Sequence, residues 1–457
     1  MIAIILSALW GVVMMFSGIF FKRKSTAGII AILGIVALIF VSLLEYHSYL
    51  YLPLDIKGML TFSAFSQVFN LVAFICTLIY FLLNASEFEE VGNDVYEYYA
   101  LIFFILSGIC IVTSFNTLLM LFLGIEIISI PLYILAGSDK RNLKSNEASL
   151  KYFLMGSFST GIMLMGIVFL YGATGTFNIQ AMHLGADKPT PMVAIGLVLL
   201  LAAMSFKVSA APFHFWAPDV YDGSPTIFTS LMATIIKVAS FVAFLRLFDT
   251  AFGKMHVQWQ LLAAIIAAAT LFIGNITAVF QQSVKRMLSY SSIAQAGFMM
   301  LSIFALNTFA KEGIILYSAA YSLASIGSFA VLVKMKDYSF EGFNGLRKTN
   351  PFLALMNTIF LLSLTGIPLS AGFIAKYYML IGTVKNGNYF WLAIFAVLMA
   401  AISAIYYFRL IQAMYFKEGN AEAKPLSTTY KAALVITAGL VIFIGAFPNV
   451  LIKALYN

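Results

Sequence analysis

Long apolar runs recur along this 457-residue chain and limit its possible folds more than any other feature. Apolar residues make up 62% of the sequence and charged residues 10%, whereas soluble globular domains contain roughly 45–50% and 25%. The runs are about 20 residues long, the length that an α-helix needs to cross the hydrocarbon core, whereas strands of a membrane barrel alternate over about 10 residues. The sequence therefore predicts an all-α protein that crosses a membrane many times, and it excludes a water-soluble fold.

About fourteen spans account for the apolar residues, because 62% of 457 is about 283 residues and each span uses about 20. The runs place these spans at 2–21, 26–44, 64–84, 97–114, 117–137, 147–171, 190–217, 224–248, 257–281, 286–308, 312–335, 352–383, 388–415 and 430–453. We divide the chain into an N-terminal three-helix segment, two halves of five spans each and a C-terminal helix, at 1–96, 97–248, 249–416 and 417–457.

Lys and Arg are unevenly distributed between the two sides of the expected bundle. Fifteen lie in loops that follow odd-numbered spans, and six lie in the other loops and the C-terminus. Because cytoplasmic loops carry the excess of Lys and Arg, we expect both termini on the outer side, and we interpret the net charge of +8 as a sign of orientation. The stretch from Glu87 to Glu97 is expected to be a cytoplasmic loop. The first run lacks a preceding positive region and a cleavage signal, which favours a retained span over a signal peptide.

Two predicted spans contain helix-breaking residues beside an ionisable group. The seventh carries Lys207 and Pro212, and the twelfth carries Pro368 and Lys376. Proline removes a backbone donor and clashes with the carbonyl four residues earlier, so both spans should be broken where protein or water can satisfy the backbone. Paired broken helices in corresponding halves of a transporter indicate an ion path.

Several ionisable residues lie deep in the predicted spans. Glu126 is the only acidic residue well inside one, Lys237 lies about twelve residues from either end of another, and His214 is the only histidine outside a predicted loop. A charge at the bilayer centre costs about 2.5–3.5 kcal/mol, and such residues mark ion or proton paths. Lys151 and Lys285 lie nearer to span ends and are further candidates.

A purely structural interpretation stays open for each candidate. Lys151 would extend to the headgroups, and Lys285 would belong to an ordinary basic pair at a cytoplasmic end. Glu126 and Lys237 would belong to static ion pairs between helices, His214 would be a packed, hydrogen-bonded side chain, and the two lysines beside the breaks would only stabilise the backbone.

Buried lysines with one movable carboxylate can store and release protons. A lysine has a pKa of about 10.4 in water, and burial lowers such values by up to about 3–5 units. A carboxylate about 4 Å away, at an effective dielectric of about 20, favours the protonated amine by about 4 kcal/mol, so moving it away releases a proton. The chain has no P-loop, no dinucleotide-binding turn, no intramembrane pair of histidines for haem, and no metal-ligand spacing at Cys76 or Cys110. The driving energy must come from a partner or an ion gradient.

Five stretches of the sequence resemble the antiporter-like membrane subunits of proton-pumping NADH:quinone oxidoreductase, respiratory complex I, and most closely the subunit N type. They are FLGIEIISIPLYILAG (122–137), EASLKYFLMGSFSTGIMLMGIVFLYGATG (147–175), FKVSAAPFHFWAPDVYDGSPT (206–226), NITAVFQQSVKRMLSYSSIAQAGF (275–298) and LTGIPLSAGFIAKYYML (364–380). PFHFWAPDVY and QQSVKRMLSYSSIAQ are typical of the wider family, which includes subunits of multisubunit cation/proton antiporters. The VYDGSPT ending narrows the resemblance towards subunit N.

The resemblance implies roles for the matching residues. Glu126 resembles the glutamate that pairs with the lysine of the broken seventh helix, here Lys207. Lys237 matches the connecting lysine of the eighth helix. His214 matches the histidine of the hydrophilic axis, and Lys376 the terminal residue of the broken twelfth helix.

Two further implied roles concern the candidates nearer to the membrane surfaces. Lys151 and Lys285 fall on additional ionisable positions of the family. The lysine at position 376 argues against the sister subunit that carries glutamate there.

The resemblance implies two antiporter-like five-helix repeats and a proton-translocating membrane-arm subunit in a bacterial plasma (inner) membrane. It would couple NADH-to-quinone electron transfer in other subunits to outward proton pumping, loading Lys237 from the cytoplasm and releasing through Lys376. No cofactor is expected in this chain; NADH, quinone, FMN and iron–sulfur clusters are expected in partner subunits. The expected partners are other membrane-arm subunits and the lipid bilayer, not nucleic acid.

The sequence has two alternative functional interpretations. A subunit of a cation/proton antiporter driven by a sodium or potassium gradient would use the same helices. A membrane cytochrome is disfavoured because His214 has no intramembrane histidine partner.

Overall fold

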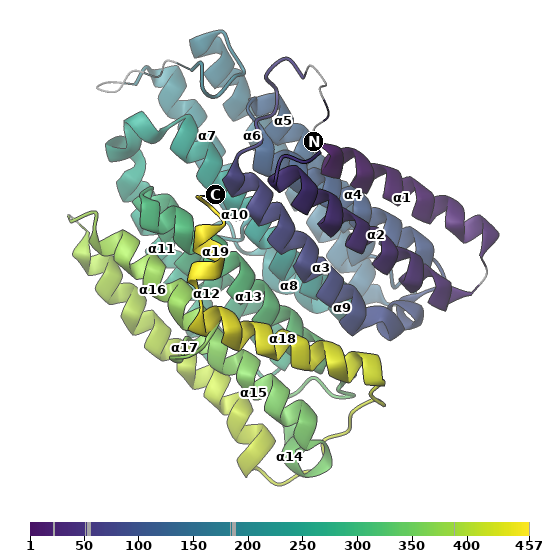
Figure 1. The fold of residues 1–457 in the computed structure, drawn as a ribbon. Helices are drawn as coiled ribbons and strands as arrows, with labels where there is room; N and C mark the ends of the chain where they lie inside the picture. The colour runs from purple at the N-terminus through teal and green to yellow at the C-terminus, as the bar shows by residue number, and fades with distance from the viewer. Residues whose placement is uncertain are drawn as a thin grey trace.

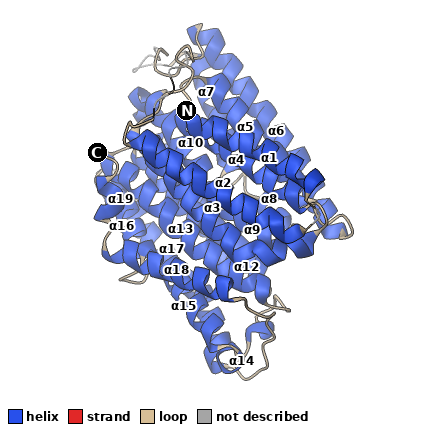
Figure 2. Ribbon diagram, turned by 45° about the vertical axis from the view of Figure 1, so that its right-hand side comes forward, coloured by secondary structure: helices blue, strands red, loops and turns tan. Residues whose placement is uncertain are grey.

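The computed structural model describes residues 1–21, 23–50, 52, 56–182, 184, 189–387 and 389–456. Helices make up the regular structure of these residues, with no β-strand among them (Figure 2). Twelve helices in the described ranges are long and apolar enough to cross a membrane, and two further spans are each split into two shorter segments. The prediction of an all-α protein with about fourteen spans is confirmed.

The first half of the chain forms α1 to α10. Their bounds are α1 Ile2–Phe20, α2 Lys24–Tyr46, α3 Ala64–Val91, α4 Val95–Ser114, α5 Leu118–Ala136, α6 Leu143–Thr174, α7 Pro191–Lys207, α8 Trp216–Gly223, α9 Thr226–Leu231 and α10 Lys237–Thr250. The second half forms α11 His256–Val279, α12 Val284–Ala305, α13 Thr308–Lys334, α14 Leu346–Thr349, α15 Pro351–Thr365, α16 Ala371–Val384, α17 Phe390–Phe416, α18 Thr428–Ala446 and α19 Asn449–Lys453. The division at residues 96, 248 and 416 stays a prediction.

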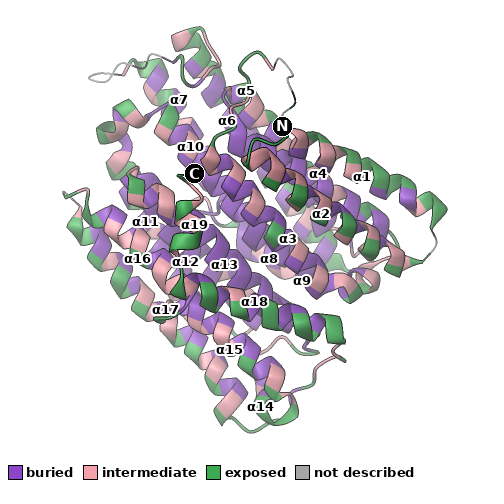
Figure 3. Ribbon diagram, in the orientation of Figure 1, coloured by how far each residue is buried: buried purple, intermediate pink, exposed green. Residues whose placement is uncertain are grey.

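The centre of the bundle is formed by α12, α13 and the span Thr226–Thr250, which contains α9 and α10 (Figure 1). Every residue from Gly313 to Lys334 is buried, and so is α12 from Ser291 onward. At the edge, α1 exposes large apolar side chains such as Phe16 and Phe20, and Figure 3 shows these outer faces in green. A helix that is apolar all round belongs in a core or faces lipid. Because α12 and α13 are buried and do not face lipid, they can carry polar groups.

Both termini lie at the same end of the bundle (Figures 1 and 2). The Met1 ammonium binds the Glu45 carboxylate at 2.6 Å, and the Tyr46 hydroxyl donates to the Ala454 carbonyl at 2.7 Å. An even number of crossings requires this arrangement. We call this end the terminal face and the opposite end the basic face. Lys22 and Lys188, which enter the loop count above, lie outside the described residues.

The expected loop from Glu87 to Glu97 is wrong, because α3 continues to Val91 and α4 begins at Val95. Glu87 lies inside α3 and is buried, with its carboxylate 2.6 Å from the Lys334 ammonium and 3.0 Å from that of Lys424. Buried charges are tolerated when they are paired, so the acidic residue does not end the helix.

Lys424 completes this buried cluster from the connection between α17 and α18. Its ammonium also lies 2.5 Å from the Glu90 carboxylate. Burial lowers the pKa of Lys424, but the hydrogen bonds and charges of Glu90 and Glu87 outweigh it and raise the pKa above its ordinary value. Glu87 with Lys334 and Lys424, here called the basic-face cluster, joins α3, α13 and the connection before α18.

The seventh and twelfth spans are broken as the sequence predicts. The seventh ends its first segment at Lys207 and resumes at Trp216. The twelfth ends its first segment at Thr365 and resumes at Ala371. Gly366 has φ +91°, a left-handed conformation that glycine adopts without strain, and it closes α15 there.

A π-helical turn, Met232–Ile236, interrupts the eighth span immediately before Lys237. The Tyr321 hydroxyl donates to the Ala233 carbonyl at 2.7 Å. A π-turn widens the helix and displaces carbonyls from their usual partners, so a side chain from a neighbouring helix can satisfy one of them. Such turns are frequent at functional sites.

Candidate functional site: lysines along the bundle core

Lys207 and Glu126 face each other across a serine. The Lys207 ammonium donates to the Ser129 hydroxyl at 2.5 Å, and the Thr160 hydroxyl donates to the Glu126 carboxylate at 2.9 Å. In the described part of the chain, no ion pair within 4.0 Å joins Glu126 to Lys207. The expected direct pair is absent from this structure. Because Ser129 follows Glu126 by three residues, it lies on the same face of α5 and takes the place of the carboxylate.

Lys237 is buried at the start of α10, with 1% of its surface exposed. Its ammonium donates to the Ser292 carbonyl at 3.1 Å and to the Ser292 hydroxyl at 2.9 Å, and it lies 5.5 Å from the centroid of the Tyr221 ring. Among the described residues, no carboxylate lies within 4.0 Å of it. Neutral hydrogen-bond acceptors and the π-face of a tyrosine therefore surround this amine.

Lys376 binds the open end of the helix on the other side of its break. Its ammonium donates to the carbonyls of Leu364 at 2.8 Å and Thr365 at 2.9 Å, and it lies 4.6 Å from the centroid of the Phe298 ring. The last carbonyls of a helix have no partner within the helix and carry partial negative charge. The break after α15 thus creates an acceptor site for a cation in the bundle core.

Lys285 binds a second helix end in the same way. Its ammonium donates to the carbonyl of Asp222 at 2.8 Å, in the last turn of α8, and to that of Ser224 at 2.6 Å, just beyond it. Its surface is 6% exposed. The interpretation of an ordinary basic pair at the membrane surface does not account for this buried contact.

A stripe of polar residues on α12 joins Lys285 to Lys237. The Ser289 hydroxyl donates to the Lys285 carbonyl at 2.9 Å, and the Ser292 hydroxyl donates to the Ser289 carbonyl at 2.7 Å. Positions spaced by four and three residues lie on one face of a helix. The α12 stripe, defined as Lys285, Ser289 and Ser292, leads inward from the basic face and ends at the amine of Lys237.

Lys151 lies at the surface, unlike the buried lysines Lys237, Lys285 and Lys376. Its ammonium is 2.8 Å from Glu147 and 3.2 Å from Asp219, and Asp219 also lies 3.3 Å from Arg286. These residues line an open cavity of about 160 Å³ next to the end of α8, together with Lys144, Ala148, Asp222 and Gly223. Asp219 and Arg286 were not among the predicted residues, although the APDVYDG stretch on α8 contains both acidic positions of this cavity.

His214 lies in the break between α7 and α8. It is buried, its ring packs against that of Phe215 at 4.4 Å between centroids, and its Nδ1 has no hydrogen-bond partner among the described residues. No described hydrogen bond between side chains joins it to the lysines. No described contact therefore connects His214 to the predicted path.

Three residues near Lys376 were missed by the sequence reasoning. Gln295 donates to the Leu364 carbonyl at 2.9 Å, and it accepts a hydrogen bond from Tyr317. Tyr317 and Tyr321 line a small cavity together with Gln295 and Lys376. The continuation of the polar α12 spacing to position 295 is the signal that could have indicated the glutamine.

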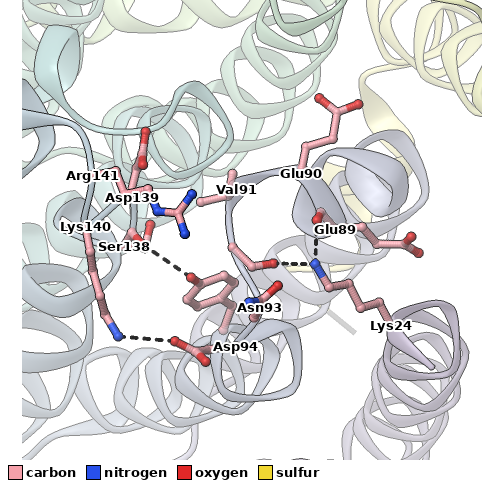
Figure 4. Close-up of a pocket in the computed structure, with 12 residues that line it drawn as sticks. Lys24, Glu89, Glu90, Val91, Asn93, Asp94, Ser138, Asp139, Lys140 and Arg141 are labelled. Atoms are coloured by element: carbon pink, nitrogen blue, oxygen red, sulfur yellow. Dashed lines mark hydrogen bonds and ion pairs between the residues drawn. The ribbon is translucent and has the colours of Figure 1, made fainter. Parts of the chain in front are cut away.

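A larger cavity, about 500 Å³, opens at the basic face near the N-terminus of α2 (Figure 4). There the Lys24 ammonium donates to the carbonyls of Glu89 and Gly92, and Lys140 pairs with Asp94 at 3.3 Å. None of the seven predicted site residues lines it. The described ranges contain no group of three or more His, Cys, Asp or Glu side chains placed to hold a metal ion.

Residues 116–403 match the family model described as "NADH:quinone oxidoreductase/Mrp antiporter, TM". The chain belongs to this family. The matched segment contains all the candidate residues from Glu126 to Lys376, and the resemblance expected from the sequence is confirmed.

Individual relatives cover nearly the whole chain. NADH-quinone oxidoreductase subunit N of Cytophaga hutchinsonii is 40% identical over 458 residues, which cover 99% of this chain and 98% of the relative. A chain of respiratory complex I from Thermus thermophilus, solved with bound aureothin, superposes with a TM-score of 0.85 at 31% identity and covers 99% of both chains. A chain of the Mrp complex from Dietzia sp. DQ12-45-1b superposes with a TM-score of 0.84 at 17% identity, covering 100% of this chain and 96% of that one, which shows a shared fold.

Proposed function

We propose that this chain is a subunit N: a proton-translocating membrane-arm subunit of an NADH:quinone oxidoreductase. It takes part in that enzyme as a translocase and couples NADH-to-quinone electron transfer in other subunits to outward proton pumping. The family membership and the 40% identity to a subunit N over almost the full length support this function.

The observation that carries the proposal is the environment of Lys237. This amine lies in the bundle core with neutral partners, between the α12 stripe and the region that holds Lys376. A buried amine without a counter-charge gives up and regains a proton more easily than one locked in an ion pair. A static ion pair, the structural alternative, has no described acidic partner for Lys237.

The proposed path runs from the basic face to the terminal face. Protons enter past Lys285, reach Lys237 along the α12 stripe, and leave by way of Lys376. The basic face is cytoplasmic, because it carries the excess of Lys and Arg, and both termini are therefore periplasmic. The membrane is a bacterial plasma membrane.

Lys207 and Glu126 set the proton affinity of Lys237 in this scheme. In this structure Lys207 is bound to Ser129, one turn away from Glu126. Rotating the Lys207 amine onto the Glu126 carboxylate would gain about 4 kcal/mol at 4 Å and an effective dielectric of about 20. A gain of this size is enough to change the proton affinity of Lys237. Lys151 and His214 act at the margin of the path, the first in the surface cavity and the second in the α7–α8 break.

The redox chemistry is assigned to partner subunits. NADH, FMN, iron–sulfur clusters and quinone bind there, and this chain binds no cofactor. The partners of this chain are other membrane-arm subunits and the bilayer.

Extraction of the native assembly in mild detergent tests this function. We expect the chain to copurify with NADH- and quinone-binding subunits and with NADH oxidation that is coupled to proton transport. The family also contains Mrp antiporter components, which have the same fold. Cation-dependent proton flux from an assembly without NADH- or quinone-binding subunits would favour that second function instead.

A further inference from the structure

Tyr321 of α13 lies between the surroundings of Lys237 and those of Lys376. The Tyr321 hydroxyl donates to the Ala233 carbonyl and lies beside the side chain of Ser292, the residue that binds Lys237. Tyr321 also lines a cavity of about 10 Å³ whose walls include Lys376. Tyr321 therefore lies next to Ser292, which binds Lys237, and it also lines the cavity of Lys376.

The same cavity has polar walls on other sides. Tyr317, one turn before Tyr321 on α13, donates to the Gln295 amide oxygen, and the Gln295 nitrogen donates to the Leu364 carbonyl. The Lys376 ammonium donates to this carbonyl and to that of Thr365, which leaves its third N–H for another acceptor. A cavity of about 10–15 Å³ holds one water molecule if two to four polar groups surround it.

We propose that this cavity, walled by Tyr317, Tyr321, Gln295 and Lys376, is a proton-transfer site that binds one water molecule and connects Lys237 to Lys376 through the Tyr321 hydroxyl. The inference rests on the proposed function and adds the residues and the ligand for one step of it. Neither tyrosine was among the residues predicted from the sequence.

The step balances as a chain of hydrogen exchanges. Lys237 gives a proton to the Ser292 oxygen, Ser292 passes its own hydrogen to Tyr321, Tyr321 passes its hydrogen to the water, and the water protonates a neutral Lys376 amine. Each oxygen gains one bond to hydrogen and loses one, and nothing is oxidised or reduced. In this structure the Ser292 hydroxyl binds the Ser289 carbonyl and the Tyr321 hydroxyl binds the Ala233 carbonyl, so both hydroxyls must turn for the transfer. A hydroxyl can serve in this way because it both donates and accepts.

Tyr321→Phe in the assembled complex tests the inference, because it removes one oxygen atom and keeps the ring. NADH-driven proton uptake into vesicles, measured per assembled complex, is expected to fall at least about tenfold, which corresponds to about 1.4 kcal/mol in the transfer barrier. Tyr406→Phe is the matched control. Tyr406 is also buried, it donates to Asn275 at 3.0 Å, and it does not line the cavity. Its loss should leave pumping near the wild-type level.

Two comparisons distinguish a failure of this inference from a failure of the proposed function. If Lys237→Met stops pumping while Tyr321→Phe pumps like the wild type, the inference is overturned and the proposed function stands. If Lys237→Met also pumps normally, the proposed function itself fails. An experimental map of the complex gives an independent result: density for one water between Tyr321 and Lys376 supports the inference, and a side chain filling this space contradicts it.

Discussion

Replacing Lys237 with methionine is expected to abolish NADH-driven proton pumping, with a loss of at least about a hundredfold. Methionine keeps the length and apolar stem of lysine but cannot carry a proton, and a positioned proton-transfer group typically contributes about 10²–10⁴ in rate. The Ser292 hydroxyl would lose the amine that it binds at 2.9 Å, so the α12 stripe would end without an acceptor. The readout is acidification of vesicles that contain the reconstituted complex.

Lys311→Met is the matched control for this variant. Lys311 lies near the terminal face, 44% of its side chain is exposed, and it pairs with Asp249 at 2.8 Å. Such exposed pairs contribute about 0–1 kcal/mol, so pumping should stay close to the wild-type rate. Unchanged pumping by the Lys237 variant, with the complex fully assembled, would show that this amine is not on the proton path.

Replacing Glu87 with alanine is expected to destabilise the fold by about 3–5 kcal/mol, the usual cost of breaking a buried ion pair from one side. The variant leaves the Lys334 ammonium, of which 5% is exposed, without its carboxylate at 2.6 Å. Lys424 keeps Glu90 and should stay charged. Thermal unfolding of the purified complex measures the effect as a lowered midpoint for this subunit.

Two further variants show whether an unpaired charge causes this loss. Glu422→Ala breaks an exposed pair with Lys336 on the same face and should not change the midpoint measurably. Combining Glu87→Ala with Lys334→Met removes both buried charges of the pair and should recover most of the stability. If Glu87→Ala unfolds like the wild type, the basic-face cluster does not hold α3, α13 and the segment before α18 together.

The sequence was sufficient to predict the spans because their signal is local. Runs of about 20 apolar residues mark helices, and Pro212 and Pro368 mark the two breaks by backbone chemistry alone. The predicted loop at Glu87 was wrong, because a charged residue indicates the end of a span when the sequence does not show which residue it pairs with. That partner, Lys334, lies 247 residues away in the chain and meets Glu87 only in the folded bundle.

The candidate site was predictable to the extent that depth in a span identifies it. Lys237 and Lys376 are conspicuous because lysine is costly in lipid. The serine that separates Lys207 from Glu126 is not conspicuous, since rotamers decide which of two acceptors an amine contacts. Tyr321 escaped notice for a related reason: its aromatic ring suits an apolar helix, and the role of its hydroxyl depends on what the neighbouring helices place beside it.

An experimental structure of the intact complex that resolves bound water would show whether a hydrated polar path joins Lys285, Lys237 and Lys376. We expect ordered water molecules among the polar groups from Lys285 through Lys237 to Lys376. Closely packed apolar side chains between these three amines, with no water and no polar group to join them, would contradict it.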